Sequence, residues 1–331
     1  MKKNEQEARM ASNKGGARAV SRATAAVLAA LVTLPGYGAR TAVAQNAGAA
    51  RAPSTPAPVA QGAQPAGKVV TVFGQKIHYV EAGTGPVVVL LHGLGGNTSN
   101  WAFNVPALAQ KYRVVVPDQI GFGRSDKPFI NYRVGTYADF LDKFLDELKI
   151  EKASLVGNSM GGWIAALYAL QKPARVERLV LVDAAGFRLP KEFDLAALSG
   201  LNPSTRDATR QLAVMIFANK QLAASDAAID AMLAQRISAG DGHTIQSLIE
   251  SIHRGEDMLD GRLGAIKQPT LVVWGREDRL TPLAREGERF KREIVGSRLV
   301  VFDNCGHGPQ FECAADFNAA VLKFLAGGTQ E

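Results

Sequence analysis

Short apolar runs recur along most of the chain, and each is followed by glycine or polar residues. They cover residues 87–91, 114–117, 153–156, 179–182, 270–274 and 299–302, and they predict β-strands. Residues 163–170 follow one of these runs and have the pattern of a helix. Alternating strands and helices predict an α/β fold, in which functional residues gather at the carboxyl ends of the strands.

The alternation stops after residue 183, and helices are predicted over residues 207–219, 225–240 and 243–250. Apolar residues recur there at helical spacing, which predicts the core of a helical cap or the wall of a pocket; they are Leu212, Met215, Ile216, Ile229, Met232 and Leu233. We therefore expect a cap over residues 189–264, which can cover an active site and exclude water. The core would comprise residues 68–188 and 265–331.

The N-terminal segment differs from the rest in composition. A stretch with several Lys and Arg residues precedes the apolar run 23–34, and small residues follow at 42–44. This pattern predicts a signal peptide over residues 1–44, cleaved after Ala44, and an exported protein. The apolar run is short for a membrane span, so no stable span is expected; an uncleaved anchor and an Ala-rich tail are the alternatives. Residues 45–67 are rich in Ala, Pro and Gly and predict a flexible linker.

The chain has 331 residues, 47% of them hydrophobic, which is enough for one sizeable core. Its formal net charge of +7 would suit a polyanionic partner if it were spread over the fold. Residues 1–67, however, hold eight Lys or Arg and two Glu, so they carry +6 and leave +1 for the remainder. The distribution of charge therefore gives no support for nucleic-acid binding.

A serine with glycines two residues before and after it, Gly157-Asn158-Ser159-Met160-Gly161, stands between a predicted strand and a predicted helix. This is the G-x-S-x-G pattern of a nucleophile elbow, a tight turn that holds a strained serine at the edge of the sheet. Glycine is needed where the strand and the helix nearly touch. The pattern also occurs by chance, so the interpretation of Ser159 as a nucleophile needs a base and an acid elsewhere.

Enzymes with this elbow supply the acid and the base in the chain order Ser, Asp or Glu, His. His307 follows a strand in a glycine-flanked loop, which would put it at the same sheet edge as Ser159. Asp278, in the loop after the preceding strand, is the predicted acid. Asp183, at the end of an earlier strand, is the alternative, whereas Glu277 is expected to face solvent.

Acyl transfer also needs donors for the negative charge that develops on the attacked carbonyl oxygen. We expect the backbone N–H groups of Met160, directly after the serine, and Leu94, in an earlier glycine-rich loop, to form this oxyanion hole. His92 begins that loop and is expected to hold it together by hydrogen bonds. Asp118 is expected to order the turn that follows it.

Taken together, these segments resemble the α/β-hydrolase family from about residue 68 to residue 325. The matching motifs are His92-Gly93-Leu94-Gly95, Asp118-Gln119-Ile120-Gly121-Phe122-Gly123-Arg124-Ser125-Asp126-Lys127-Pro128, Gly157-Asn158-Ser159-Met160-Gly161-Gly162, Trp274-Gly275-Arg276-Glu277-Asp278-Arg279 and Cys305-Gly306-His307. The resemblance implies an eight-stranded, mostly parallel sheet with flanking helices and a helical cap inserted after strand six. It also implies a catalytic triad of Ser159, Asp278 and His307.

The serine separates the chain from the dehalogenases and epoxide hydrolases of this family, which carry Asp at that position. The chain resembles two subgroups with a serine nucleophile. One comprises esterases and lipases, and the other comprises hydrolases that cleave a C–C bond in products of aromatic ring cleavage. Asn158 before the nucleophile and Arg236 in the cap favour C–C hydrolysis, since they match the C–C hydrolases at these positions, where the arginine binds the substrate carboxylate. An exposed helix arginine is the alternative for Arg236. Gly308, where the C–C hydrolases have Trp, and the expected export favour ester hydrolysis, which is the main prediction.

Other functions are compatible with the same fold, including a haloperoxidase-like side reaction or a binding module that has lost the chemistry. No metal-ligand spacing or complete dinucleotide fingerprint is visible, so we expect no cofactor and no metal. The expected partner is a small-molecule ester substrate. Cys305 and Cys313 are expected to be small buried residues, with a disulfide as the alternative. The oligomeric state is left open.

Overall fold

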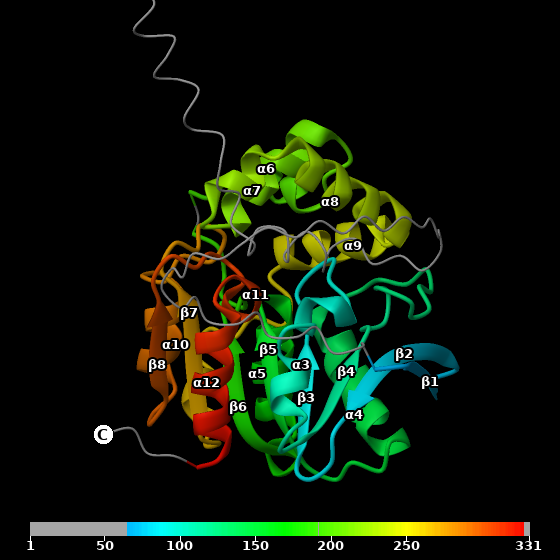
Figure 1. Ribbon diagram of the computed structural model, residues 1–331, viewed down its shortest axis with the longest axis vertical. Helices are drawn as coiled ribbons and strands as arrows, with labels where there is room; N and C mark the ends of the chain where they lie inside the picture. The colour runs from blue at the N-terminus through cyan, green and yellow to red at the C-terminus, as the bar shows by residue number, and fades with distance from the viewer. Residues whose placement is uncertain (1–64, 191, 328–331) are drawn as a thin grey trace, which may run out of the picture.

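The computed structural model describes residues 65–190 and 192–327 (Figure 1). The expected signal peptide, and all but the last three residues of the expected linker, lie outside these ranges. The first strand, β1 (Gly67–Val72), begins one residue before the expected start of the core. None of the helices in the described ranges combines the length and the apolar character that a bilayer span requires.

Eight strands form one sheet in the order β1-β2-β4-β3-β5-β6-β7-β8. After β1 come β2 (Gln75–Ala82), β3 (Val87–Leu91), β4 (Arg113–Pro117), β5 (Ala153–Asn158), β6 (Val176–Val182), β7 (Thr270–Gly275) and β8 (Arg298–Phe302). The β1–β2 and β2–β4 pairs are antiparallel, and all the others are parallel. The expected eight-stranded, mostly parallel sheet is confirmed, and the six apolar runs are β3 to β8.

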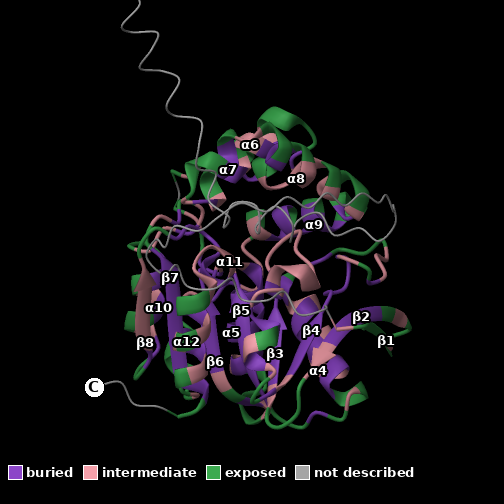
Figure 2. Cartoon of the chain, viewed as in Figure 1, coloured by how far each residue is buried: buried purple, intermediate pink, exposed green. Residues whose placement is uncertain are grey.

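Helices cover both faces of the sheet, so the central strands are buried (Figure 2). One face packs on α4 (Val134–Glu147), α5 (Met160–Gln171) and α10 (Gly287–Glu293), and the other on α3 (Val105–Leu108) and α12 (Ala314–Leu325). On β5, for example, Leu155 packs in the first layer and Val156 in the second. The short elements are η2 (Thr98–Trp101), η3 (Pro173–Arg175), η5 (Leu263–Ala265) and α11 (Pro309–Glu312).

Between β6 and β7 the chain forms a helical cap over the carboxyl ends of the strands (Figure 1). It consists of η4 (Leu195–Leu201), α6 (Arg206–Ile216), α7 (Lys220–Ala224), α8 (Asp226–Ala239) and α9 (Gly242–His253). The helix expected over 207–219 is shorter, because the side chain of Asn219 caps a separate helix, α7, by accepting from the N–H of Gln221. Helices α6, α7 and α8 share a small apolar cluster of their own.

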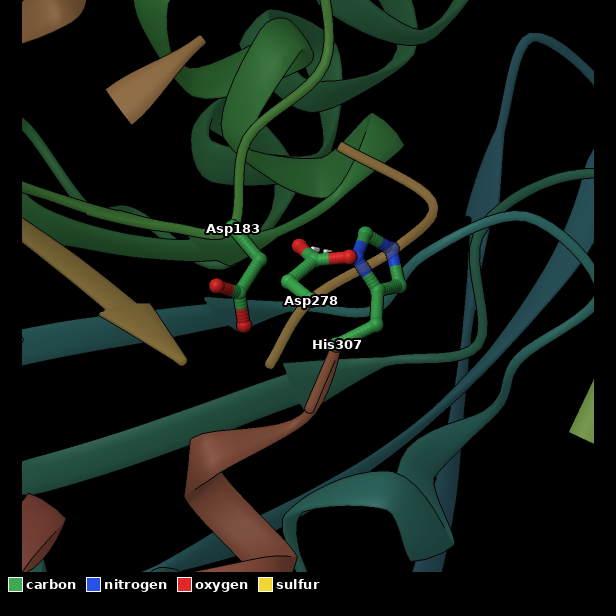
Figure 3. A group of neighbouring side chains, drawn as sticks. All are labelled: Asp183, Asp278 and His307. Carbon is green, nitrogen blue, oxygen red and sulfur yellow. Dashed lines mark hydrogen bonds and ion pairs between the residues drawn. The ribbon is translucent and has the colours of Figure 1, made fainter. Parts of the chain in front are cut away.

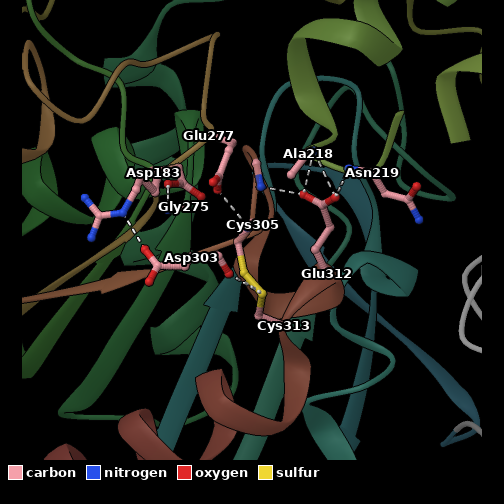
Figure 4. The surroundings of a disulfide bond; sticks show 11 residues. Asp183, Ala218, Asn219, Gly275, Glu277, Asp303, Cys305, Glu312 and Cys313 are labelled. Atoms are coloured by element: carbon pink, nitrogen blue, oxygen red, sulfur yellow. Dashed lines mark hydrogen bonds and ion pairs between the residues drawn. A yellow bond between two sulfur atoms is a disulfide. The ribbon is translucent and has the colours of Figure 1, made fainter. Parts of the chain in front are cut away.

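Cys305 and Cys313 form a disulfide that ties the loop after β8 to the start of α12 (Figure 4). The expectation of two unpaired buried cysteines is wrong, since their Cα atoms lie 6.3 Å apart, within the range of a bridge. Two carboxylates hold the same loop. Glu277 accepts the N–H of Cys305 at 3.0 Å, so it does not merely face solvent, and Glu312 accepts the N–H of Gly306 at 2.6 Å. The loop that carries His307 is therefore held at several points.

Candidate active site

The turn between β5 and α5 has the conformation of a nucleophile elbow. Ser159 sits at φ 56° and ψ −119°, a region that non-glycine residues rarely adopt. A Cβ on Gly157 would lie 2.2 Å from the carbonyl oxygen of Gly161, and a Cβ on Gly161 would lie 2.2 Å from that of Leu91. Both glycines are therefore required by the close approach of the strand and the helix, as the sequence pattern indicated.

His307 and Asp278 are hydrogen-bonded at the same edge of the sheet (Figure 3). The distance from Nδ1 of His307 to Oδ2 of Asp278 is 2.8 Å. The carboxylate is fixed in turn, because its Oδ1 accepts the N–H groups of Leu280 and Thr281 at 2.8 and 3.0 Å. With the proton of the neutral ring on Nδ1, the lone pair lies on Nε2, where a general base needs it. This Nε2 is buried and has no hydrogen-bond partner among the described residues.

Ser159 and His307 line one cavity, with a volume of about 240 Å³, between the sheet edge and the cap. Gly93 lies against the elbow, since a Cβ there would be 3.1 Å from Cβ of Ser159. Leu94, the next residue, also lines the cavity. Met160 is the first residue of α5, where N–H groups have no intrahelical acceptor. The two residues expected to form an oxyanion hole thus both adjoin the nucleophile elbow.

Asp183, the alternative acid, lies close by but has different partners. It is fully buried, its Oδ1 accepts the N–H of Gly275 at 2.9 Å, and its Oδ2 has no hydrogen-bond partner within the described chain. Burial, and then the charge of Asp278, raise the pKa of Asp183 well above its usual value. Side-chain ligand atoms of Asp183, Asp278 and His307 lie within 4.8 Å of one another, but the oxygens of Asp278 already accept several hydrogen bonds. The contacts of Asp278 therefore suit a carboxylate that orients His307.

The two residues expected to bind substrate, Asn158 and Arg236, both line the cavity. The amide of Asn158 donates to the carbonyl oxygens of Val182 and His307, at 3.3 and 3.2 Å, so it also positions the histidine loop. Arg236, on α8, pairs with Asp241, a cavity residue that the sequence analysis did not single out. Burial lowers the pKa of Arg236, but a guanidinium remains protonated in proteins.

His92 and Asp118 have the structural roles expected of them. Nδ1 of His92 donates to the carbonyl oxygen of Gly93 at 2.8 Å, and its Nε2 accepts the N–H of Gln119 at 3.0 Å. Burial lowers the pKa of His92, in keeping with a neutral ring that uses both nitrogens. Asp118 accepts the N–H of Arg124 at 2.8 Å and so orders the following turn.

A family model described as alpha/beta hydrolase fold matches residues 86–314. The chain belongs to the α/β-hydrolase family. A related α/β hydrolase, the 2-hydroxymuconate semialdehyde hydrolase of Pseudomonas sp. (strain CF600), is 33% identical over 268 residues, which are 78% of this chain and 94% of that protein.

Solved structures of the family fall into more than one functional group. The meta-cleavage product hydrolase from Pseudomonas fluorescens IP01 has a TM-score of 0.72 and 30% identity, over 79% of this chain and 98% of that one. A bacterial membrane phospholipase A has a TM-score of 0.70 and 28% identity, over 79% and 86% of the two chains. Membership of the family supports a hydrolase, and the similar α/β hydrolases include the C–C hydrolases that the sequence analysis ranked second.

Proposed function

We propose that this α/β hydrolase cleaves a C–C bond beside a ketone in a product of aromatic ring cleavage, with Ser159 as the nucleophile. The observation that carries the proposal is the position of Arg236 in the cap, on the same cavity as Ser159 and His307. Similarity to a 2-hydroxymuconate semialdehyde hydrolase and a meta-cleavage product hydrolase supports it. The proposal reverses the order expected from sequence, in which ester hydrolysis came first.

The reaction would use the groups around the cavity in sequence. Nε2 of His307 takes the proton of Ser159 Oγ as that oxygen attacks the ketone carbon, while the N–H groups of Leu94 and Met160 stabilise the oxyanion. Asp278 orients the ring and stabilises its charged form. The electron pair of the cleaved bond passes into the conjugated leaving half, whose carbon takes the proton from His307. Water, activated by His307, then releases the acid from the acyl-enzyme.

Ester hydrolysis is the second candidate, and a specific observation favours it. Asp241 balances the charge of Arg236, which reduces the attraction of the cavity for a substrate carboxylate. The cap wall is apolar where Leu212, Ile216 and Met232 line the cavity, as an acyl chain would require. The similarity to a phospholipase A points the same way. The same residues would act, with an alkoxide in place of the carbon leaving group.

A direct comparison of substrates tests the proposal. Purified protein is assayed with a 2-hydroxy-6-oxo-dienoate, by loss of its ultraviolet or visible absorbance, and with p-nitrophenyl butyrate. We expect a higher kcat/KM for the dienoate, and loss of both activities in Ser159→Ala. Ser238→Ala, at an exposed serine on α8, is the matched control and should behave as wild type. Turnover of the ester without turnover of the dienoate would reject C–C hydrolysis in favour of the second candidate.

A further inference from the structure

The wall of the cavity contains an ion pair made by two residues of the cap. Arg236, near the end of α8, pairs with Asp241, which immediately precedes α9. Gly240, at φ 65°, turns the chain between the two helices and brings the two side chains together. Their exposed fractions are 14% for Arg236 and 1% for Asp241, and both residues line the cavity that contains Ser159. The pair is therefore largely buried in the wall of the cavity that Ser159 and His307 also line.

The guanidinium of Arg236 also reaches the glycine-rich loop after β3. A Cβ on Gly95 would lie 2.4 Å from Nη1 of Arg236, so this end of the arginine lies directly against the backbone of the loop. Gly95 has a φ of 69°, and it follows Leu94, one of the two expected oxyanion donors. A group that binds Arg236 is thus held within the same small cavity as the attacked carbonyl group.

Asp241 depends on Arg236 for its charge balance. Both of its carboxylate oxygens are buried without a hydrogen-bond partner in the described part of the chain, where Arg236 is the cation paired with it. A buried carboxylate needs such a counter-charge, because desolvation strongly disfavours an isolated ion. The pair as a whole is neutral. The cavity therefore contains an arginine without the net positive charge that an arginine alone would give it.

A carboxylate that enters this cavity meets Asp241 as well as Arg236. It must share or displace the resident carboxylate, and two like charges repel strongly where water is excluded. A neutral carbonyl oxygen can accept an N–H of the guanidinium without that repulsion. Hydrolysis at Ser159 always releases a carboxylate product, so the same repulsion would also weaken the binding of product.

We propose that Asp241 is a specificity-determining residue, a resident counter-ion that limits how tightly the cavity binds a carboxylate, whether of substrate or of product. The proposal rests on the proposed function only in that the substrate occupies the cavity shared by Ser159 and Arg236. It applies equally to C–C and to ester hydrolysis, because both reactions would use this cavity and both release an acid.

The test compares two esters with the same leaving group, p-nitrophenyl butyrate and mono-p-nitrophenyl glutarate, of which the second carries a distal carboxylate. In Asp241→Asn, which keeps the size of the side chain and removes its charge, the ratio of kcat/KM for the charged over the neutral ester should rise by about tenfold or more. Inhibition by glutarate should tighten in parallel. Adding Arg236→Gln should abolish the gain. Asp230→Asn, an exposed acid on α8 paired with Arg206, is the control and should leave the ratio unchanged.

An unchanged ratio in folded Asp241→Asn would overturn the proposal, and Asp241→Ser gives the same comparison if the asparagine variant does not fold. Protection of Ser159 by glutarate against a fluorophosphonate probe provides a readout without turnover. Stronger protection in the variant than in wild type supports the proposal, and equal protection overturns it. A dienoate that is not cleaved, together with a raised ester ratio, would reject C–C hydrolysis and leave the role of Asp241 intact.

Discussion

At the scale of single residues, the chemistry depends on which carboxyl group orients His307. Sequence order places both Asp183 and Asp278 at the ends of neighbouring parallel strands, so it predicts two candidates at one edge. Only the three-dimensional arrangement shows Asp278 in contact with Nδ1. The Arg236–Asp241 pair was not predicted, because it depends on how Gly240 turns the chain between two helices. An arginine and an aspartate on either side of a helix-ending glycine were the available signal.

Replacing each of the two acids in turn with asparagine tests which of them orients His307. In Asp278→Asn, the amide can donate to Nδ1 and thereby stabilise the wrong tautomer, so kcat should fall by about 10³–10⁴-fold. Asp183→Asn should lower kcat less than about tenfold, because Asp183 makes no hydrogen bond to the ring in the described structure. Steady-state kinetics with p-nitrophenyl butyrate provide the measurement. The opposite ranking of the two variants would assign the acid to Asp183.

Asp183 should also make stability depend on pH. Because its native pKa is raised, the unfolded chain loses this proton near the ordinary value of 3.8, while the native state retains it to higher pH. The free energy of unfolding should therefore fall as pH rises from about 4 towards the native pKa, by at most about 1.4 kcal/mol per pH unit. Asp183→Asn removes this loss, so its Tm relative to wild type should be higher at pH 8 than at pH 4. A difference in Tm that is constant with pH would contradict the assignment.

At the scale of elements, the site depends on close contact between β5, α5 and the loop after β3. The sequence predicted this contact well, since glycine spacing around a serine is a local signal. It predicted the ends of the cap helices and the state of the cysteines less well. The division of the first cap helix depends on the side chain of Asn219, and the disulfide depends on how α11 brings Cys313 back towards Cys305. Neither is determined by local pattern alone.

Gly161→Ala tests this contact. The new Cβ would lie 2.2 Å from the carbonyl oxygen of Leu91 and 2.7 Å from that of His92, and backbone atoms cannot move aside as a flexible side chain can. We expect the free energy of unfolding to fall by about 3 kcal/mol or more, together with slower labelling of Ser159 by a fluorophosphonate. Gly200→Ala is the control, since its Cβ would meet no atom within 4 Å. Equal chemical denaturation curves for the two variants would contradict the close packing.

At the scale of the whole molecule, the proposed active site lies between the carboxyl edge of the sheet and the cap. The sheet supplies Ser159 and His307, and the cap supplies much of the cavity wall. The two parts are also linked directly, because the N–H of His307 donates to the carbonyl oxygen of Ile216 at the end of α6 at 2.7 Å. The sequence predicted that a cap would be present and that Arg236 would contribute to the site, and Arg236 does line the cavity. It did not separate the apolar residues of the cap core from those of the cavity wall, because both recur at helical spacing.

Leu212 on α6 is one of those wall residues, so Leu212→Trp should shorten the cavity from the cap side. The kcat/KM for p-nitrophenyl octanoate should then fall at least about tenfold more than that for p-nitrophenyl acetate, because only the longer acyl group needs the space that the indole fills. Val214→Trp on the same helix is the matched control, since Val214 is 47% exposed and does not line the cavity. If both variants gave the wild-type ratio of the two esters, α6 would not form the acyl wall, and the choice of substrate would have to be assigned to the core.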